Sequence, residues 1–537
     1  MSAGHEEGNI LQQHRPFIRM TAMLLAAAAA AAFTGCRSSR TPSGGGSDAS
    51  SAVSTGDLPT IDGTGSTDGG ESEKTTMNEQ TAADRTTTGG RQTAGSAGTG
   101  GTAATTAART TGSTTDDTPK SDDGYAFDGD PSTLWTAPSF GTTVLTYRPK
   151  QAVTFNTVRF KERGDRIDEI AVEIPDGKGG YLPVYRQDEV GIRLGVLDRA
   201  VTAAEVRVTV TSAQRPVIED ITFENVQPFV RKEKFRIVSY LTANMTDARA
   251  NFDKLDIMTD LILFGRTSWT QTGELDFGTE GIARFERDLA EIREAIGSRQ
   301  IDLWLCIGNY APGTDRSKLF VDPADRKRLI DTCVDMTKRY NFVGIDIDYE
   351  YPADAACWDN YAVFLEELGA ALKKEGKLLS VALSPWGVRL SKAAIRSIDR
   401  VNIMSYTLND RKKRRHAFKI TRTSIEYFTD LGFAPSQLVL GLAFYAMSVT
   451  QPDASYSGHP YHTYVQRYRT GIKTYTNQIE DLYYGGRDLN RDKTILAIEN
   501  GLAGAFSWHF GCDIAYSDER SLFRAVKETA DRFTAIK

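Results

Sequence analysis

The strongest constraint on the fold is a regular alternation of apolar, strand-like runs with amphipathic segments between residues 234 and 537. Helical periodicity lies between most of the runs, as in residues 282–297 and 361–376. Eight strand-then-helix units in one stretch predict a closed (β/α)8 barrel, the TIM-barrel class of α/β folds. The eight runs are FRIVSYL (235–241), DLILFG (260–265), IDLWLCIG (301–308), FVGIDID (342–348), LLSVALSP (378–385), RVNIMSY (400–406), LVLGLAFY (438–445) and LAGAFSW (502–508).

A doubly wound open sheet is the structural alternative for the same alternation. Its usual function is to bind nucleotides, but no Gly-rich phosphate loop follows any of the runs. The net charge of -6 gives no indication of a basic surface for nucleic acid, so no nucleic-acid partner is expected. Five cysteines without a CxxC pair and six scattered histidines favour no metal and no cofactor.

The fourth run continues into GIDIDYEYP (344–352), which places Asp346, Asp348 and Glu350 on alternate positions. Side chains alternate faces along a strand, so the three acids share one face, with neighbouring Cα atoms roughly 6–7 Å apart. That face points into the barrel and leads to its catalytic rim. Burying three unpaired carboxylates is costly unless they share protons, and a shared proton supplies an acid at neutral pH.

The stretch GIDIDYEYP resembles the Asp-x-x-Asp-x-Asp-x-Glu signature of glycoside hydrolase family 18, which contains chitinases and endo-β-N-acetylglucosaminidases. Three further motifs follow in the order of the barrel strands. VNIMSY (401–406) is similar to the family's sixth-strand Met-x-Tyr motif. LVLGLAFYA (438–446) and GAFSWHFGCD (504–513) are similar to its seventh and eighth strands. The resemblance covers residues 234–537 and implies a catalytic TIM barrel there.

The resemblance also implies roles for individual residues. Glu350 would be the general acid/base, and Asp348 would orient the N-acetyl group of the substrate. Asp346 would share a proton with Asp348, and Tyr406 would donate a hydrogen bond to the acetyl oxygen. The implied substrate-binding residues are Trp508 beneath the −1 sugar, Met404, Tyr240 and Tyr445. For Tyr445, a packing role and a sugar-subsite role are both open.

By the same resemblance, we expect a retaining, endo-acting hydrolase of β-1,4 bonds in N-acetylglucosamine-containing glycans. Family 18 uses the acetamide oxygen of the substrate as the nucleophile, which is an exception to the two-carboxylate scheme. The expected partner is a GlcNAc-containing polysaccharide or a glycoprotein glycan. Two alternatives remain: an endo-β-N-acetylglucosaminidase that acts on N-glycan cores, and a non-catalytic glycan-binding lectin.

Three positions depart from the family pattern. Val343 stands at the first Asp of the signature, CIGN (306–309) replaces Ser-x-Gly-Gly, and Thr407 replaces the Asp after Met-x-Tyr. The segment after Tyr445 is short and leaves little room for the α+β insertion that deepens many chitinase grooves. We therefore expect a shallow, endo-acting cleft, with residues 455–469 as one wall.

Residues 124–229 contain short β-branched runs with alternating polarity, punctuated by Gly, Pro and Asp. This pattern predicts an antiparallel β-sandwich. The stretch from Phe127 to Trp135 resembles discoidin-like sandwiches, many of which bind carbohydrate. Trp135 is expected in the core, with a sugar-stacking role as the alternative. Asp128 and Asp130 are expected to cap a turn, with a structural calcium site as the alternative.

The N-terminal residues 1–36 contain basic residues, then a short apolar run, then Gly35-Cys36. This resembles a bacterial lipoprotein signal, in which Cys36 would carry the lipid and anchor the protein to a membrane. An ordinary secretory signal is the alternative. Residues 37–123 are rich in Thr, Ser, Gly and Ala, which predicts a disordered linker. We expect an exported protein, anchored to the bacterial cell envelope.

Overall fold

The structure is a computed structural model. It describes residues 122–130, 132–188, 191–308, 316–406, 417–448, 459–469 and 471–537. The predicted signal segment, the lipidation site Cys36 and nearly all of the predicted linker lie outside these ranges, as do Asn309 and Thr407. Among the helices that the structure describes, none combines the length and the apolar character needed to cross a membrane.

Two antiparallel four-stranded sheets precede the barrel, as predicted. Their apolar side chains alternate with exposed ones; β7, for example, is buried at every second residue. Leu145, Phe155 and Val208 are fully buried between the sheets. One sheet has the order β1 (Trp135–Thr136), β8 (Val217–Glu224), β3 (Val153–Glu162), β6 (Ile192–Ala203), and the other β2 (Gly141–Tyr147), β7 (Val206–Ser212), β4 (Glu169–Pro175), β5 (Tyr181–Asp188).

The contacts of Trp135 and of Asp128 and Asp130 favour structural roles for these residues in the sandwich. Trp135 is only 3% exposed, so its ring is part of the sandwich core. The Asp128 carboxylate accepts a hydrogen bond of 2.9 Å from the backbone N–H of Asp130, and also bonds to the Thr133 hydroxyl. The Asp130 carboxylate accepts from the backbone N–H of Ser132 at 2.9 Å. These are turn-capping contacts.

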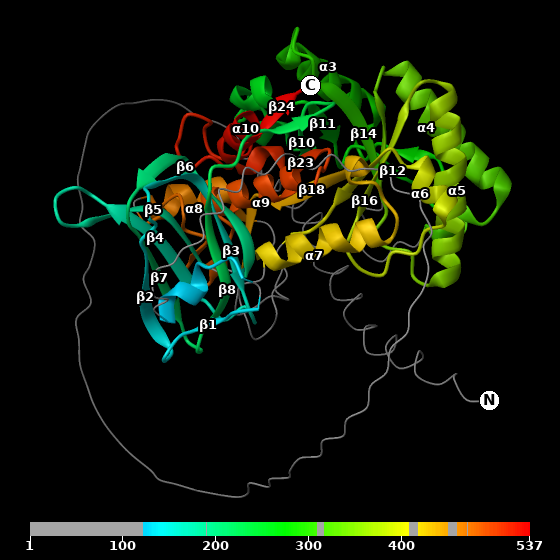
Figure 1. Ribbon diagram of the computed structural model, residues 1–537. Coiled ribbons are helices and arrows are strands. Elements are labelled where there is room, and N and C mark those ends of the chain that lie inside the picture. Colours follow the sequence, from blue (N-terminus) through cyan, green and yellow to red (C-terminus); the bar gives the residue numbers. More distant parts are fainter. Residues whose placement is uncertain are drawn as a thin grey trace, which may run out of the picture. The chain divides into compact units, whose positions relative to one another are not determined.

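The barrel consists of eight parallel strands, and each predicted run contains one of them (Figure 1). Parallel pairing runs from β10 through each neighbour and returns from β23 to β10, which closes the cylinder. The fold-class prediction is therefore confirmed. The strands are β10 (Arg236–Leu241), β11 (Asp260–Leu263), β14 (Asp302–Gly308), β15 (Gly344–Asp348), β16 (Leu378–Leu383), β17 (Arg400–Ile403), β18 (Leu438–Ala443) and β23 (Gly504–Trp508).

A helix follows each barrel strand. Several begin where a side chain caps the first turn: Asp322 accepts a hydrogen bond from the Ala324 N–H, and Ser521 accepts one from the Arg524 N–H. Helix α3 ends at Gly297, whose positive φ suits a glycine. The helices are α2 (Met245–Arg249), α3 (Gly281–Ile296), α4 (Pro323–Arg339), α5 (Ala355–Lys374), α6 (Lys392–Ser397), α7 (Ala417–Asp430), α9 (Arg487–Glu499) and α10 (Leu522–Phe533).

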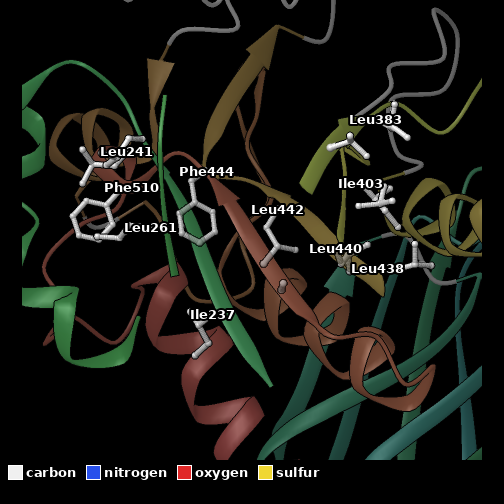
Figure 2. Packing of buried hydrophobic residues seen from close by; sticks show 14 of the residues in the cluster. Ile237, Leu241, Leu261, Leu383, Ile403, Leu438, Leu440, Leu442, Phe444 and Phe510 are labelled. Carbon is white, nitrogen blue, oxygen red and sulfur yellow. The ribbon is translucent and has the colours of Figure 1, made fainter. Parts of the chain in front are cut away.

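Alternate residues of the barrel strands belong to two separate apolar layers. One set lies between the strands and the helices, where it forms the main hydrophobic core (Figure 2). The other set lies inside the barrel and includes Val238, Ile262 and Phe506. The residues labelled in Figure 2 all belong to this main core, and all except Phe444 and Phe510 lie on barrel strands: Ile237, Leu241, Leu261, Leu383, Ile403, Leu438, Leu440, Leu442, Phe444 and Phe510.

A small α+β element stands between β18 and α9, where the sequence analysis expected little room for one. It contains a sheet of four short strands and the helix α8 (Tyr461–Tyr468). That expectation is wrong, because strands of two residues are enough to build this element. The sheet has the order β20 (His459–Pro460), β19 (Tyr445–Ser448), β22 (Leu482–Tyr483), β21 (Gln478–Ile479).

The sandwich and the barrel belong to one compact unit. Between them, β9 (Phe229–Arg231) pairs in parallel with β24 (Thr534–Ile536) at the C-terminus. The Asp492 carboxylate of α9 accepts hydrogen bonds from the Tyr185 hydroxyl at 2.7 Å and the Val196 N–H at 2.9 Å, both in the sandwich. Burial of this carboxyl raises its pKa to about 6, against the opposing effect of Arg193.

Candidate active site

The predicted acids lie on β15, in the wall of the barrel. All five residues of this strand are buried. Its neighbours place Cys306 of β14 and Ser380 of β16 on either side of Asp346. Only glycine fits at residue 344, at the start of the strand, because a Cβ there would lie 2.2 Å from the Leu378 carbonyl oxygen. The strand therefore presents Asp346, and then Asp348, along the barrel interior toward the C-terminal rim.

Asp346 is fully buried and held by hydrogen bonds from neighbouring strands. The Tyr240 hydroxyl donates to it at 2.9 Å, and the side-chain amide of Asn402 donates at 3.0 Å. Burial raises the pKa of this carboxyl, while hydrogen bonds from Ser380, Tyr240 and the Cys306 thiol oppose the rise. Asp346 is thus a buried partner for the acid above it, held in place by several hydrogen bonds.

Asp348 is in a different environment, although it is only two residues further along. It is 6% exposed, and its Oδ1 is buried without a hydrogen-bond partner. Burial raises its pKa well above the usual range, and the charges of Glu350 and Asp346 raise it further. A proton on Asp348 at neutral pH is the expected state, because three neighbouring buried carboxylates cannot all be ionised.

Glu350 completes the series at the rim. Burial raises the pKa of its carboxyl to about 7, against a hydrogen bond from Tyr351 that lowers it. The residue as a whole is partly exposed, yet its Oε2 is buried and has no partner. A carboxyl that titrates near neutrality can donate a proton in one step and accept one in the next.

Aromatic side chains surround the acids. Tyr240 is 2% exposed and lies 5.4 Å from Trp508, measured between ring centroids. Tyr406 meets Tyr445 edge to face at 5.8 Å. Met404 belongs to the same buried group inside the barrel. The structure therefore gathers all eight implied catalytic and substrate-binding residues in one barrel interior, whereas Cys36 lies outside the described residues.

A polar layer beneath the acids was not predicted. The Arg400 guanidinium stacks 4.4 Å from the Trp304 ring centroid and donates to Asp260 at 2.9 Å. Asp260 also accepts from the Trp304 indole N–H at 2.9 Å and from Arg236 at 3.1 Å. The positive charge of Arg400 opposes the rise of the Asp346 pKa. The alternate positions Arg400, Asn402 and Met404 are the sequence signal that could have indicated this face.

Val343 and Cys306, at two of the three departures from the family pattern, lie within the described residues. Val343 packs against the apolar interior of the barrel, so no charge replaces the first signature acid there. Cys306 is buried and retains a hydrogen bond to Asp346 through its thiol. Within the described ranges, all four cysteines are free thiols, and no three His, Cys, Asp or Glu side chains come together as a metal site requires.

Comparisons with known proteins agree with this arrangement. The family model "Glycosyl hydrolases family 18" matches residues 236–532, more than half of the chain. Probable chitinase 10 of Drosophila melanogaster is 24% identical over 281 residues, which cover 44% of this chain and 12% of that protein. The class V chitinase of Arabidopsis thaliana is 26% identical over 280 residues, 42% of this chain and 72% of that protein.

Among solved structures, the GH18 chitinase ChiB from the chitin utilization locus of Flavobacterium johnsoniae has a TM-score of 0.48 and 21% identity. The match covers 57% of this chain and 96% of that one. The extent of the family match, together with a closed barrel that carries the acids on its fourth strand, leads to one conclusion: this chain belongs to the glycosyl hydrolases of family 18.

Proposed function

We propose that this protein is a retaining glycoside hydrolase that cleaves β-1,4 bonds in GlcNAc-containing glycans of the chitin type. One arrangement carries the proposal: Glu350 and Asp348 lie together in an aromatic-lined barrel, where burial raises the pKa of Glu350 to about 7 and that of Asp348 well above its usual range. The names of the curated relatives, which are chitinases, support the choice of substrate class.

In the proposed reaction, protonated Glu350 gives its proton to the glycosidic oxygen as the bond from that oxygen to C1 breaks. The acetamide oxygen of the −1 sugar forms the new bond to C1 and gives an oxazolinium ion. The carboxyl of Asp348 orients the acetamide group, and Tyr406 donates a hydrogen bond to its oxygen. Ionised Glu350 then takes a proton from water, which attacks C1 as the bond from C1 to the acetamide oxygen breaks. The acetamide group is restored, and the anomeric configuration is retained.

The first prediction is that the full chain cleaves chitooligosaccharides and that Glu350→Gln reduces kcat at least about 1,000-fold, because the amide cannot act as an acid. Product chromatography on GlcNAc hexamers measures this, with a high-mannose glycoprotein as the second substrate. Release of the glycan from the glycoprotein alone would favour an endo-β-N-acetylglucosaminidase. Binding of hexamers without cleavage would favour a lectin, and equal rates for the Glu350→Gln variant would contradict the assigned role.

A further inference from the structure

Two hydroxyl groups at the barrel rim have no place in the roles given above. Tyr351 directly follows the proposed acid/base, and Ser384 directly follows β16. Their side-chain oxygens are 2.6 Å apart, and Ser384 is only 2% exposed. The Tyr351 side chain also makes a hydrogen bond to the Glu350 carboxyl group. The three side chains thus form a continuous chain of polar contacts.

The sheet itself brings these groups together. Strands β15 and β16 pair in parallel, with Asp346 opposite Ser380 and Ile347 opposite Val381. Glu350 and Ser384 each lie three residues beyond the pair Ile347–Val381, just past the ends of their strands. The register of the two strands therefore brings both residues to the same level of the rim.

The direction of the hydrogen bonds can be assigned. A tyrosine hydroxyl has a single proton, and an ionised carboxylate can only accept. Tyr351 therefore donates to Glu350, and the Ser384 hydroxyl must donate to the Tyr351 oxygen. The Oε2 atom of Glu350 is buried without a partner, so the contact falls on the other oxygen. In the proposed reaction, Oε2 is therefore the oxygen that protonates the glycosidic oxygen.

We propose that Ser384 and Tyr351 form a hydroxyl relay that fixes the orientation of the Glu350 carboxyl group and stabilises its ionised form. Both act through Glu350, so they are positioning residues. The inference rests on the proposed function and deepens it: the relay stabilises Glu350 after it has given up its proton, and holds it ready to deprotonate water.

The test is a pH titration of the Glu350 carboxyl in the full chain without substrate, by infrared difference spectroscopy with Glu350→Gln to assign the signal. Tyr351→Phe removes the bond to the ionised carboxylate, so the midpoint should rise by about one pH unit. Ser384→Ala should raise it less, because Tyr351 remains. Ser384→Thr keeps the hydroxyl and should titrate as the wild type does.

Tyr361→Phe is the matched control. Tyr361 is a fully buried tyrosine on α5 whose hydroxyl lacks a hydrogen-bond partner in the described structure. Its loss should leave the midpoint unchanged. If the Tyr351→Phe midpoint equals those of the wild type and Tyr361→Phe, the relay is overturned. If Tyr351→Phe does not fold, a Ser384→Ala midpoint equal to that of the wild type overturns it instead. Failure of the wild type to cleave chitooligosaccharides would contradict the proposed function while leaving the titration readable.

Discussion

The carboxyl group of Glu350 shows how chemistry and stability conflict at a single residue. Its ordinary pKa of 4.5 applies in the unfolded chain, and burial raises the pKa in the folded protein to about 7. The folded state therefore binds a proton more tightly than the unfolded state does, so the free energy of unfolding falls as pH rises from about 4.5 to about 7. At higher pH, the folded protein holds an ionised group that would be more stable in water.

A Glu350→Gln variant should therefore be more stable than the wild type at pH 8, with a difference of up to about 3 kcal/mol from the shift of roughly 2.5 pH units. Below about pH 4.5 the difference should vanish, because the carboxyl is then protonated in both states. Urea unfolding at pH 4 and pH 8 measures both free energies. Equal stability at pH 8 would show that burial of the carboxyl costs little.

Sequence reasoning could identify the acids but not the groups that hold them. The alternation of Asp346, Asp348 and Glu350 is visible in the sequence because one strand and the residues directly after it contain all three. Asn402 and Ser384 contact these acids or their neighbours from other strands, and their contacts depend on strand order and register. A single Asn or Ser in a strand-like run carries no signal of this kind.

Strand β17 is the element that connects the catalytic strand to its surroundings. The side-chain amide nitrogen of Asn402 lies 3.0 Å from the Tyr240 hydroxyl, from Asp346 and from the Ser380 hydroxyl, and shares its two N–H groups among these acceptors. These acceptors lie on β10, β15 and β16, so one side chain links four strands inside the barrel. The prediction that belongs to this element is a loss of both stability and activity when the amide is removed.

Asn402→Ala should lower the free energy of unfolding by about 2–3 kcal/mol, because it leaves buried polar groups without a donor. It should also reduce kcat about 10-fold or more, since Asp346 loses one of the bonds that fix it. Denaturant unfolding and hexamer hydrolysis measure the two effects. Asn500→Ala, in an exposed residue that ends α9, is the control and should stay within about 0.5 kcal/mol of the wild type. A similar loss in both variants would contradict the assigned role of β17.

At the level of elements, prediction succeeded for long segments with a clear apolar pattern and failed for segments too short to show one. All eight barrel strands lie in predicted runs, because each is an apolar segment between amphipathic helices. The sandwich was predicted as a set of short runs in residues 124–229, without a range for each strand. The two-residue strands β20, β21 and β22 are too short to show any alternation, so the small element after β18 was missed.

At the scale of the whole molecule, the interface between sandwich and barrel depends on buried charge. Twelve of the thirteen residues of α9 are buried, including Arg491 and Asp492, although its sequence has the charge pattern of a surface helix. The side chains of Arg193 and Asp492 are completely buried, with their nearest charged atoms 3.6 Å apart. No single stretch of sequence could reveal this, because the partners lie about 300 residues apart along the chain.

Asp492→Asn should destabilise the protein by about 3–5 kcal/mol, because it leaves the Arg193 cation buried without its counter-charge. Arg193→Met should cost a similar amount, and the double variant clearly less than the sum of the two. Urea unfolding followed by tryptophan fluorescence gives all three values. Additive losses, or unfolding of the barrel in a transition that none of these changes affects, would show that the two parts are energetically independent.

The layer of Arg400, Asp260 and Trp304 closes the base of the barrel beneath the acids. Among the described residues, this layer fills the barrel interior below Asp346, so the glycan and the water both approach Glu350 from the C-terminal rim. In the proposed reaction, the leaving half of the glycan occupies the side of C1 from which water then attacks, because the configuration is retained. Its departure should therefore precede the attack of water.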